Sequence, residues 1–377
     1  MAKVALIECN GYGFNAVNEA LRQAIDSLGG IEKFVRKGER VLLKPNVLGP
    51  YAPEAAVTTH PAVVKAVIQL VKEAGAIPFI GEMSWLDERR STAENFKASG
   101  LKALAEEEAI ELIPFETAGF KKVKVKGKRL SEAFVALPVL EADRIISLPK
   151  LKTHLDAIMT CAIKNSFAFI PMKTRKQGHS LKRLEFHEFL VDVFSIRKPD
   201  LVLADAIEAM DGNGPTRGGK VKMGLIAASD DGVALDSAMA SISGLKEGLS
   251  MEAAGRGLGE ADLSRIVFSA LKPEQFMHSF RPPSTIVSNS VPAFLRQFFV
   301  AMLSPQLFVD ETKCTNCMEC VNYCPSKAFE VKRFPKLIES KCIQCYGCRE
   351  LCKPKAIKSR TRKFGKIIHW VREKFEV

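Results

Sequence analysis

Eight of the ten cysteines in this chain lie in one short stretch near its C-terminus. They form two runs, and each run reads C-x2-C-x2-C-x3-C. Three thiolates on such a tight loop can reach three irons of a 4Fe–4S cube, so the spacing predicts iron–sulfur chemistry. The first run consists of Cys314, Cys317, Cys320 and Cys324, and the second of Cys342, Cys345, Cys348 and Cys352.

Two runs of this kind predict two 4Fe–4S clusters with exchanged ligands. Each loop supplies three thiolates, and the fourth iron of each cube must be ligated from elsewhere in the chain. In bacterial-type two-cluster ferredoxins, the fourth cysteine of each run ligates the other cluster. The spacing therefore assigns the first cluster to Cys314, Cys317, Cys320 and Cys352, and the second to Cys342, Cys345, Cys348 and Cys324.

Structural zinc and disulfide bonds are the alternative roles for these cysteines. Structural zinc sites usually use separated C-x2-C pairs, whereas each run here has a third cysteine at the same interval. A disulfide framework needs an oxidising compartment, and the N-terminal residues lack the basic start and long apolar core of a signal peptide. We therefore expect a reducing, cytoplasmic location and an electron-transfer role. The other two cysteines, Cys9 and Cys161, are expected to be buried, inert thiols.

The length and composition predict a globular protein of two or three domains. Of its 377 residues, 47% are hydrophobic and 26% are charged, and no stretch offers the roughly 20 uninterrupted apolar residues of a membrane-spanning helix. Residues 308–377 contain 16 lysines and arginines against 8 acidic residues, which accounts for most of the formal net charge of +12. Part of this excess offsets the negative charge of the clusters. Because aromatic residues are few in the basic stretches, we expect no nucleic-acid partner.

Short apolar runs alternate with helical segments through the first three quarters of the chain. This alternation is typical of an α/β domain with a largely parallel sheet and helices on both faces. One helix is predicted over 15–30, ending at two glycines, and another over 60–75, with Pro61 in its first turn. A small edge hairpin is predicted over 123–130. Strands are predicted over 4–9, 40–46, 77–82, 110–114, 144–149, 201–205 and 223–229.

These patterns divide the chain into four regions. We expect the α/β domain over 1–288, an amphipathic linker over 289–307, a small α+β two-cluster ferredoxin domain over 308–357 and a basic amphipathic tail over 358–377. Apolar residues recur at helical spacing in the tail, which predicts a helix that packs against the rest of the protein. Docking of the tail to a partner protein or to an anionic membrane surface is the less favoured alternative.

Several lysines and amides come directly after predicted strands, where open α/β sheets place their ligands. Ammonium and amide groups donate hydrogen bonds to anionic oxygens, so the set predicts a site for a carboxylate or a phosphate. The alternative is that these lysines are solvated surface charges. The expected substrate-binding residues are Lys44, Asn46, Thr59, Lys150, Lys152, Lys164, Asn165, Asp211 and Asn213.

Two histidines and an aspartate in the same segments are the candidate catalytic residues. His60 and His154 have the ring chemistry of general acids or metal ligands, and Asp205 that of a general base or a divalent-cation ligand. A structural role is the alternative for His60, which precedes a proline at a helix start and could cap that helix. Asp211 could likewise only shape the turn into Gly212.

Two glycine-containing segments resemble nucleotide-binding loops. Residues 11–16 read GYGFNA after a predicted strand, but the next strand ends in Lys44, where a dinucleotide site would have an acid. The segment from Gly212 has glycines at other intervals and lacks the G-K-[ST] of a P-loop, although its backbone amides could hold an anion. A bound dinucleotide is therefore not favoured.

Five short motifs in the first 285 residues, taken with the cysteine runs, resemble those of one protein family. The motifs are VLLKPN, TTHP, LPKLKTH, CAIKN and DGNGPTRG. The family is catalogued as domain of unknown function 362, and its members often carry a C-terminal two-cluster ferredoxin domain. The resemblance implies this architecture and no particular reaction, so the function has to be argued from the site.

Two functions are compatible with these features. The first is an oxidoreductase in which the clusters exchange electrons with an anionic small molecule or cofactor precursor bound by the α/β domain. The second is a non-enzymatic electron-transfer or maturation protein whose α/β domain docks a partner. The expected partners are therefore a small-molecule substrate or a redox protein. Phosphoryl transfer with structural clusters is a third class, and it requires ATP to bind near Asp211.

Overall fold

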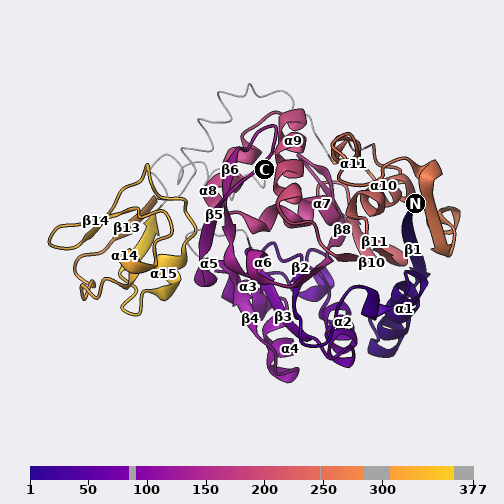
Figure 1. Ribbon diagram of the computed structural model, residues 1–377, viewed down its shortest axis with the longest axis horizontal. Helices are drawn as coiled ribbons and strands as arrows, with labels where there is room; N and C mark the ends of the chain where they lie inside the picture. Colours follow the sequence, from indigo (N-terminus) through magenta and orange to yellow (C-terminus); the bar gives the residue numbers. More distant parts are fainter. Residues whose placement is uncertain (85–90, 247, 284–305, 361–377) are drawn as a thin grey trace.

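The computed structural model describes residues 1–84, 91–246, 248–283 and 306–360. An α/β part comprises the described residues up to 283, and a small cysteine-rich part comprises 306–360 and lies against one end of it (Figure 1). Most of the predicted linker and of the predicted tail lies outside the described residues. Within the described residues, the structure contains no helix that could span a lipid bilayer.

A mixed, mostly parallel sheet of ten strands forms the centre of the α/β part. Strands β12 and β1 are parallel, β11 is antiparallel to both β1 and β10, and the neighbours from β10 to β4 are parallel. The predicted α/β class is therefore confirmed. The strand order is β12 (Ile266–Ala270), β1 (Ala2–Glu8), β11 (Gly219–Ser229), β10 (Leu201–Asp211), β7 (Arg144–Leu148), β2 (Arg40–Pro45), β3 (Ile77–Glu82) and β4 (Leu112–Pro114).

Helices cover both faces of the sheet because alternate residues of each strand point to opposite sides. On one face, Ala5 of β1 packs in a hydrophobic cluster with helices α1 (Phe14–Ser27) and α2 (Pro61–Glu73). On the other face, Leu6 packs in a second cluster with helix α10 (Gly232–Ile242). The sheet is thus the middle layer of three, as Figure 1 shows.

Helix boundaries follow local sequence signals. Pro61 occupies the first turn of α2, where its missing N–H costs nothing, and the His60 side chain accepts a hydrogen bond from the Ala62 N–H. Gly75, with a φ of 73°, follows the end of the same helix. Both predicted helices are confirmed. The other helices of the α/β part are α3 (Thr92–Ala98), α4 (Leu101–Glu107), α5 (Phe115–Ala118), α6 (Leu137–Glu141), α7 (Ala162–Asn165), α8 (Met172–His179), α9 (Arg183–Ile196) and α11 (Leu249–Ala254).

Two departures from the predicted strands change the surroundings of the site. Residues expected to follow β7 as a loop form strand β8 (Lys150–His154), which pairs with β10 and with β9 (Ile158–Thr160). Strands β10 and β11 are longer than predicted and pair antiparallel as far as Asp211 and Gly219, so the glycine-rich segment between them is a hairpin turn. A small hairpin is present, but the range predicted for it, 123–130, is mostly the turn between β5 (Phe120–Lys124) and β6 (Glu132–Ala136), and these strands form a separate two-stranded sheet instead of an edge of the main one.

The cysteine-rich part is a small α+β unit with an internal repeat. In each half, a cysteine run leads into a short helix, α14 (Glu319–Tyr323) or α15 (Gly347–Leu351). The residue before each helix, Met318 or Tyr346, has a positive φ, so the same tight loop is built twice. This architecture agrees with the predicted ferredoxin-like fold. The short strands pair as β13 (Gln306–Val309) with β16 (Ile357–Arg360), and as β14 (Phe329–Val331) with β15 (Pro335–Leu337).

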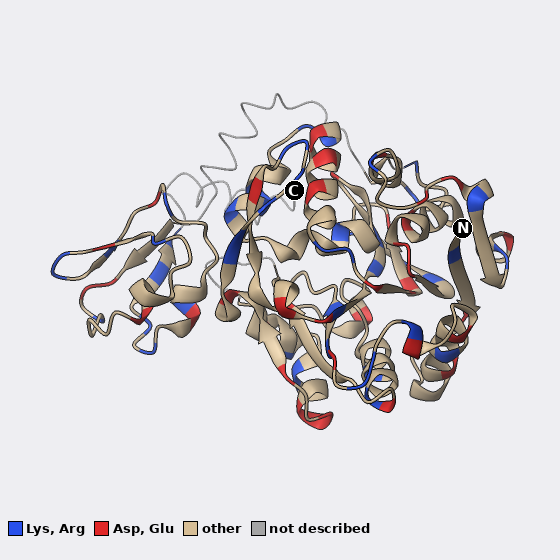
Figure 2. Ribbon diagram, viewed as in Figure 1, with Lys and Arg blue, Asp and Glu red and all other residues tan. Residues whose placement is uncertain are grey.

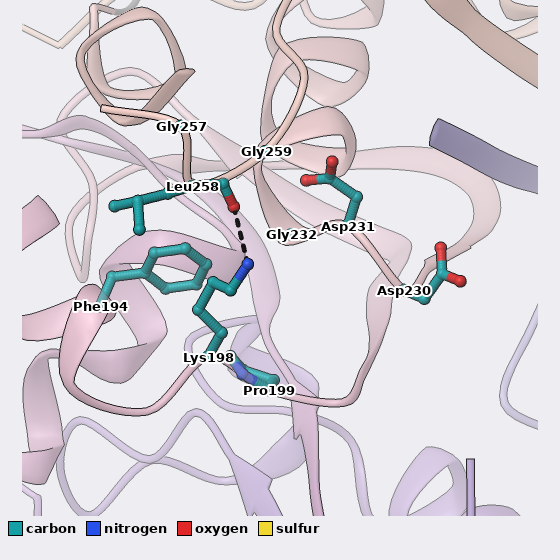
Figure 3. A pocket seen from close by; sticks show the side chains of 9 residues that line it. All are labelled: Phe194, Lys198, Pro199, Asp230, Asp231, Gly232, Gly257, Leu258 and Gly259. Atoms are coloured by element: carbon teal, nitrogen blue, oxygen red, sulfur yellow. Dashed lines mark hydrogen bonds between the residues drawn. The ribbon is translucent and has the colours of Figure 1, made fainter. Parts of the chain in front are cut away.

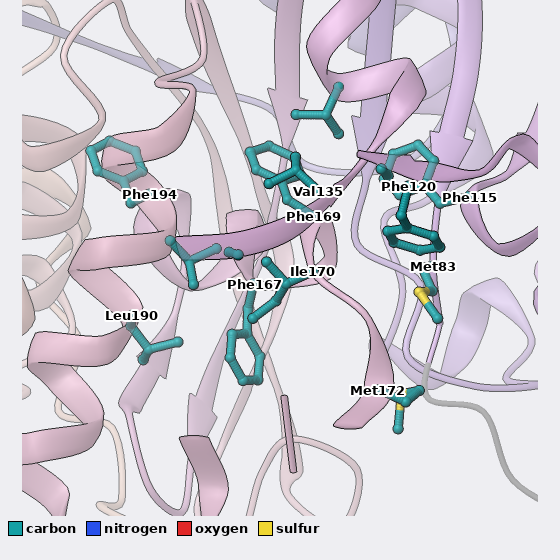
Figure 4. Close-up of a cluster of buried hydrophobic side chains, with 14 of the residues drawn as sticks. Met83, Phe115, Phe120, Val135, Phe167, Phe169, Ile170, Met172, Leu190 and Phe194 are labelled. Atoms are coloured by element: carbon teal, nitrogen blue, oxygen red, sulfur yellow. The ribbon is translucent and has the colours of Figure 1, made fainter. Parts of the chain in front are cut away.

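The cysteine-rich part packs on the α/β part through its second cysteine run. Helix α15 contacts α5, and the Tyr323 hydroxyl donates a hydrogen bond to the Glu116 backbone oxygen. One hydrophobic cluster extends across this contact, and Figure 4 shows part of it. Its members include Met83, Phe115 and Met172 from the α/β part, and Cys345, Tyr346 and Cys348 from the cysteine-rich part.

Gly347 allows α15 to approach the α/β part closely, and alanine in its place should disturb this contact. A β-carbon there would collide with the Glu116 carbonyl oxygen and with Tyr323. We expect Gly347→Ala to destabilise the packing by about 1–3 kcal/mol, so hydrogen exchange in α5 and α15 should accelerate at unchanged iron content. Gly255→Ala, where a β-carbon meets only ordinary contacts, is the matched control. Unchanged exchange in α15 would contradict the described packing.

Candidate functional site

Four cysteines from both runs line one cavity in the cysteine-rich part. Cys314, Cys317 and Cys320 come from the first run, and Cys352 comes from the second. We call these four residues the outer group, because Cys317 is exposed to solvent. Within the described residues, no three His, Cys, Asp or Glu side chains are close enough to hold a single metal ion.

The other four cysteines, of which Cys342, Cys345 and Cys348 are buried and Cys324 is half-buried, pack in the hydrophobic cluster at the contact between the two parts. A thiolate at Cys324 would raise the pKa values of Cys342, Cys345 and Cys348, because Cys324 lies among them. We call these four residues the inner group. Burial raises the pKa of Cys345 to about 12, so its thiol stays protonated until a metal displaces the proton. The two groups have the membership that crossed ligation requires, and the ligation itself stays a prediction.

Lys44, at the end of β2, is buried and paired with a carboxylate. Its Nζ lies 2.7 Å from Glu82 Oε2 and donates to Asn165 Oδ1 at 2.7 Å. Asn165 in turn donates to the Lys44 backbone oxygen and to Ser147 Oγ. Burial lowers the pKa of Lys44, and the negative charge of Glu82 opposes that shift. One buried ion pair thus ties the ends of β2 and β3 to α7.

Lys150, the first residue of β8, belongs to a second buried ion pair. Its Nζ lies 3.1 Å from Asp205 Oδ2 and donates to the Tyr12 hydroxyl at 2.6 Å. Tyr12 donates to Asp205 Oδ1 at 2.9 Å, and its ring stacks on that of His60 at a centroid distance of 3.7 Å. The His60 N–H also donates to Asp205. Asp205 therefore binds three groups of the protein, and the His60 side chain caps α2, which was its structural alternative.

Two further lysines have no carboxylate partner within the described residues. Lys152 is buried, and its Nζ donates to the Val57 backbone oxygen. Lys164 is partly exposed, and its Nζ lies 4.4 Å from the centroid of the Phe167 ring. Burial and the charge of Lys164 hold the pKa of Lys152 well below its usual range, and burial beside Arg175 lowers the pKa of Lys164 to about 7. Unpaired amines of this kind favour an anionic ligand.

Arg175, on α8, connects the lysines to the contact with the cysteine-rich part. Its guanidinium donates to the backbone oxygens of Met83 and Ser84, which directly follow β3, at 3.0 and 2.9 Å. Burial lowers the pKa of Arg175 to about 10, and the charges of Glu82 and Glu116 oppose that shift. Burial also raises the pKa of Glu116 to about 7. Charged side chains therefore extend from the ends of the strands to Glu116, whose backbone oxygen accepts the hydrogen bond from Tyr323.

These basic residues form one electrostatic unit, which we call the lysine cluster. The three lysines on β2 and β8 are at most 1% exposed, so the alternative of solvated surface charges is wrong for them. Within the described residues, ion pairs with Glu82 and Asp205 neutralise two of the lysines and leave an excess of basic groups. The lysine cluster consists of Lys44, Lys150, Lys152, Lys164 and Arg175.

His154, at the end of β8, is a neutral hydrogen-bond donor. Its Nδ1 accepts from the Asp156 N–H and the Ala157 N–H, both at 3.1 Å, which assigns the ring proton to Nε2. Burial and the charge of Lys164 hold the pKa of His154 well below its usual range. The His179 ring stacks on that of His154 at 5.7 Å, and His179 Nδ1 lies 3.0 Å from Asp156 Oδ2. Two histidines thus lie beside Lys164.

The other predicted site residues have mainly structural contacts. Thr59 accepts a hydrogen bond from the Asn46 N–H at 2.8 Å, while the buried Asn46 Oδ1 has no hydrogen-bond partner among the described residues. Asp211 forms a bidentate ion pair with Arg281, which lowers the pKa of that carboxyl. Asn213 lies in the turn between β10 and β11. Asp211 and Asn213 therefore belong to the hairpin, and the hydrogen bonds of Asp211 do not involve the lysine cluster.

Several members of this site were not among the residues expected from the sequence. Two of them carry a local sequence signal. Tyr12 follows β1 in a glycine-containing turn, and Glu82 is an acidic residue at the end of β3, the strand that pairs with the strand of Lys44. Arg175 and His179 carry no such signal, because α8 reaches the lysine cluster only through tertiary packing.

A second cavity, of about 180 Å³, lies elsewhere in the α/β part (Figure 3). Its charged residues have structural partners. Asp231 caps α10, Asp230 pairs with Lys33 at 2.7 Å, and Lys198 donates to the Leu258 backbone oxygen. None of the predicted site residues lines this cavity. The candidate site is therefore the lysine cluster and not this cavity.

Removing one partner of the Lys44–Glu82 pair should destabilise the protein more than removing both. Glu82→Gln leaves a buried ammonium without its counter-ion, which should cost about 3–5 kcal/mol in urea unfolding. Lys44→Met combined with Glu82→Gln removes both charges and should recover part of this loss. Glu106→Gln, which breaks the exposed pair with Lys102, is the control and should cost less than about 1 kcal/mol. A double variant no more stable than Glu82→Gln would refute this account of the pair.

Two family models match the chain. The model described as Domain of unknown function (DUF362) matches residues 41–241, and the model described as 4Fe-4S dicluster domain matches residues 306–353. The chain is also 35% identical over 242 residues to the "Thylakoid-associated protein sll1697" of Synechocystis sp.. That alignment covers 63% of this chain and 74% of the Synechocystis protein.

Among solved structures, the lactate racemase apoprotein of Thermoanaerobacterium thermosaccharolyticum aligns with 64% of this chain at 12% identity and a TM-score of 0.40. The chain spans 57% of the length of that protein. The first family match covers just over half of the chain, and the Synechocystis protein is matched over nearly three quarters of its length. The chain therefore belongs to the DUF362 family, and it carries a C-terminal 4Fe-4S dicluster domain.

Proposed function

We propose that this protein is an iron–sulfur oxidoreductase that acts on an anionic small molecule at the lysine cluster. The 4Fe–4S clusters would supply or accept electrons one at a time. The observation that carries the proposal is the position of the inner group, which shares a hydrophobic cluster with Met83, the residue directly after Glu82. Helix α8, which carries Arg175, also contacts the loop of the second cysteine run, because the Lys173 N–H donates to the Ile343 backbone oxygen at 3.2 Å. Electron tunnelling weakens steeply with distance, so this contact favours exchange between the inner group and the lysine cluster.

The cysteine geometry supports two 4Fe–4S clusters with crossed ligands. Cys352 lines the same cavity as three cysteines of the first run. The two crossing cysteines also have equivalent surroundings, because Cys324 Sγ accepts from the Ala328 N–H and Cys352 Sγ from the Ala356 N–H, both at 3.2 Å. Hydrogen bonds to cluster ligands stabilise the reduced, more negative state. Both halves of the unit are thus suited to hold a redox-active cluster.

The two cysteine groups suggest a route for electrons. The outer group includes the exposed Cys317, which a soluble redox partner could approach. The adjacent β14–β15 turn carries basic residues (Figure 2), and the Asn316 side chain donates to the Arg333 backbone oxygen in that turn. The inner group is buried against α5. Electrons would therefore pass between a partner and the lysine cluster through the outer group and then the inner group.

Two unpaired lysines supply the anion site. A carboxylate or phosphate oxygen would provide Lys152, which lies beside Lys164, with the counter-charge that Lys44 and Lys150 already receive from the protein. Lys152 is only 1% exposed, so a small molecule reaches it more readily than the surface of a docked protein would. This burial favours the oxidoreductase over a docking platform.

Replacing Cys352 with alanine should remove the outer cluster and spare the inner one. We expect about four rather than about eight irons per chain and a single paramagnetic species after reduction, because crossed ligation places Cys352 on the outer cube. Cys9→Ala removes a buried thiol that directly follows β1 in the α/β part, and this variant should retain all irons. If Cys352→Ala keeps every iron, or if the native protein binds zinc stoichiometrically, the crossed assignment is wrong.

Anion binding to the lysine cluster should take up protons. Burial and the charge of Lys164 hold the pKa of Lys152 well below its usual range in the protein without ligand, and an anion paired with the Lys152 amine would return that pKa toward its usual range. Binding should therefore protonate an amine, and affinity should fall as the pH rises. Calorimetry with sulfate between about pH 7 and 9, in two buffers of different ionisation enthalpy, measures the protons taken up.

Lys152→Met should weaken sulfate binding about tenfold or more, since a charge-assisted hydrogen bond is lost. Lys97→Arg, at an exposed position on α3, is the control and should bind sulfate as the native protein does. If sulfate affinity changes neither with pH nor in Lys152→Met, the anion site is refuted and the docking platform is the better account.

A further inference from the structure

Lys164 differs from the other lysines of the lysine cluster. Lys44 and Lys150 are paired with carboxylates, and Lys152 donates to a backbone oxygen. Within the described residues, Lys164 Nζ has neither a hydrogen bond nor an ion pair, and it lies over the face of the Phe167 ring. Lys164 is also the one lysine of these four that is partly exposed. Its amine is therefore available to react with a ligand.

Neighbouring groups keep this amine in its reactive form. Burial, Arg175 and Lys44 disfavour protonation and lower the pKa of Lys164 to about 7. A neutral amine is a nucleophile, whereas an ammonium is not, so a large share of the molecules carries a nucleophilic Lys164 at neutral pH. The carboxylate that acts on it most, Asp156, is already engaged by His179.

A hydrogen-bond donor for a carbonyl oxygen lies beside the amine. His154 carries its ring proton on Nε2, because Nδ1 accepts two backbone hydrogen bonds. Ring contacts connect the two side chains: Lys164 Nζ lies 4.4 Å from the centroid of the Phe167 ring, that ring lies 5.4 Å from the His179 ring, and His179 stacks on His154 at 5.7 Å. Since the imidazole stays neutral, its Nε2–H can polarise a carbonyl group while the amine attacks the carbon.

We propose that Lys164 forms an imine with the carbonyl carbon of a 2-oxo carboxylate whose carboxylate group pairs with Lys152. The bond from Nζ to carbon forms as the carbonyl π bond breaks, and the oxygen leaves as water with the two hydrogens of the amine. No oxidant or reductant takes part in this step. The inference rests on the proposed function, because it takes the lysine cluster as the substrate site.

The arrangement of donors selects this class of substrate. Lys152 and His154 are alternate residues of β8, so their side chains point to the same side of the strand, where ring contacts connect His154 with Lys164. The charge of Lys164 accordingly adds to burial in lowering the pKa of Lys152. A carboxylate on Lys152 forms a neutral pair with its ammonium, which leaves Lys164 unprotonated beside it. A carbonyl carbon adjacent to that carboxylate then lies next to Lys164. Arg175 Nε, which is buried without a hydrogen-bond partner among the described residues, is a second donor for the carboxylate.

Reductive trapping tests the imine directly. The full-length protein with its clusters is incubated anaerobically with pyruvate and cyanoborohydride, which reduces imines and spares ketones, and modified lysines are mapped by mass spectrometry. We expect one adduct, at Lys164, and none in Lys164→Arg, whereas Lys97→Arg is trapped like the native protein. Acetone lacks the carboxylate and should give about tenfold less adduct at the same concentration.

Lys152→Met distinguishes this inference from the proposed function. The variant keeps Lys164 but loses the partner of the carboxylate, so trapping of pyruvate should fall about tenfold, to the level of acetone. Iron content and circular dichroism check that each variant is folded. Adducts spread over exposed lysines, or no adduct at Lys164 although sulfate binding depends on Lys152, overturn the imine and leave the anion site standing. If the native protein neither forms the pyruvate adduct nor binds sulfate, the proposed function is overturned as well.

Discussion

Burial of ammonium groups near the ends of neighbouring strands is the constraint on which the rest of the site depends. An ammonium removed from water is costly unless a counter-ion and hydrogen bonds replace its hydration. Glu82 and Asp205 do this for Lys44 and Lys150, and the same contacts hold β2, β3, β8 and the start of α2 in one arrangement. Lys152 has no such carboxylate within the described residues. In the proposed site, a bound anion would supply the counter-charge that Lys152 lacks.

The position of the cysteine-rich part follows from the same set of contacts. Arg175 holds the chain directly after β3, and Met83 in that segment packs in the hydrophobic cluster that includes the inner group. Glu116 lies next to this contact. Burial and the charge of Glu350 raise the pKa of Glu116, and the charge of Glu116 in turn raises the pKa of Arg175. In a region of low dielectric, a change of charge on the inner cluster would therefore act on the lysine cluster, and the reverse.

Local sequence signals predicted part of this structure, and tertiary contacts decided the rest. The ferredoxin-like domain, recognised from the cysteine spacing, and the limits of α2, set by Pro61 and Gly75, depend on local signals and were predicted correctly. Strand β8 was missed because its pairing with β10 depends on residues far along the chain. In the site, lysines at strand ends were recognisable because parallel strands end at one edge of a sheet. The burial of Lys152 and the approach of Arg175 were not, because lysine and arginine are usually exposed and only packing reveals their partners.

The central claim is that the inner cysteine group and the lysine cluster share one electrostatic environment. An anaerobic redox titration followed by electron paramagnetic resonance tests this claim when it is run with and without sulfate at matched ionic strength. A bound anion disfavours the reduced, more negative state of a nearby cluster. We predict that sulfate lowers the reduction potential of the inner cluster and leaves that of the outer cluster unchanged, with Cys352→Ala assigning the two signals. Identical potentials with and without sulfate, or a shift of the outer cluster alone, would contradict the account.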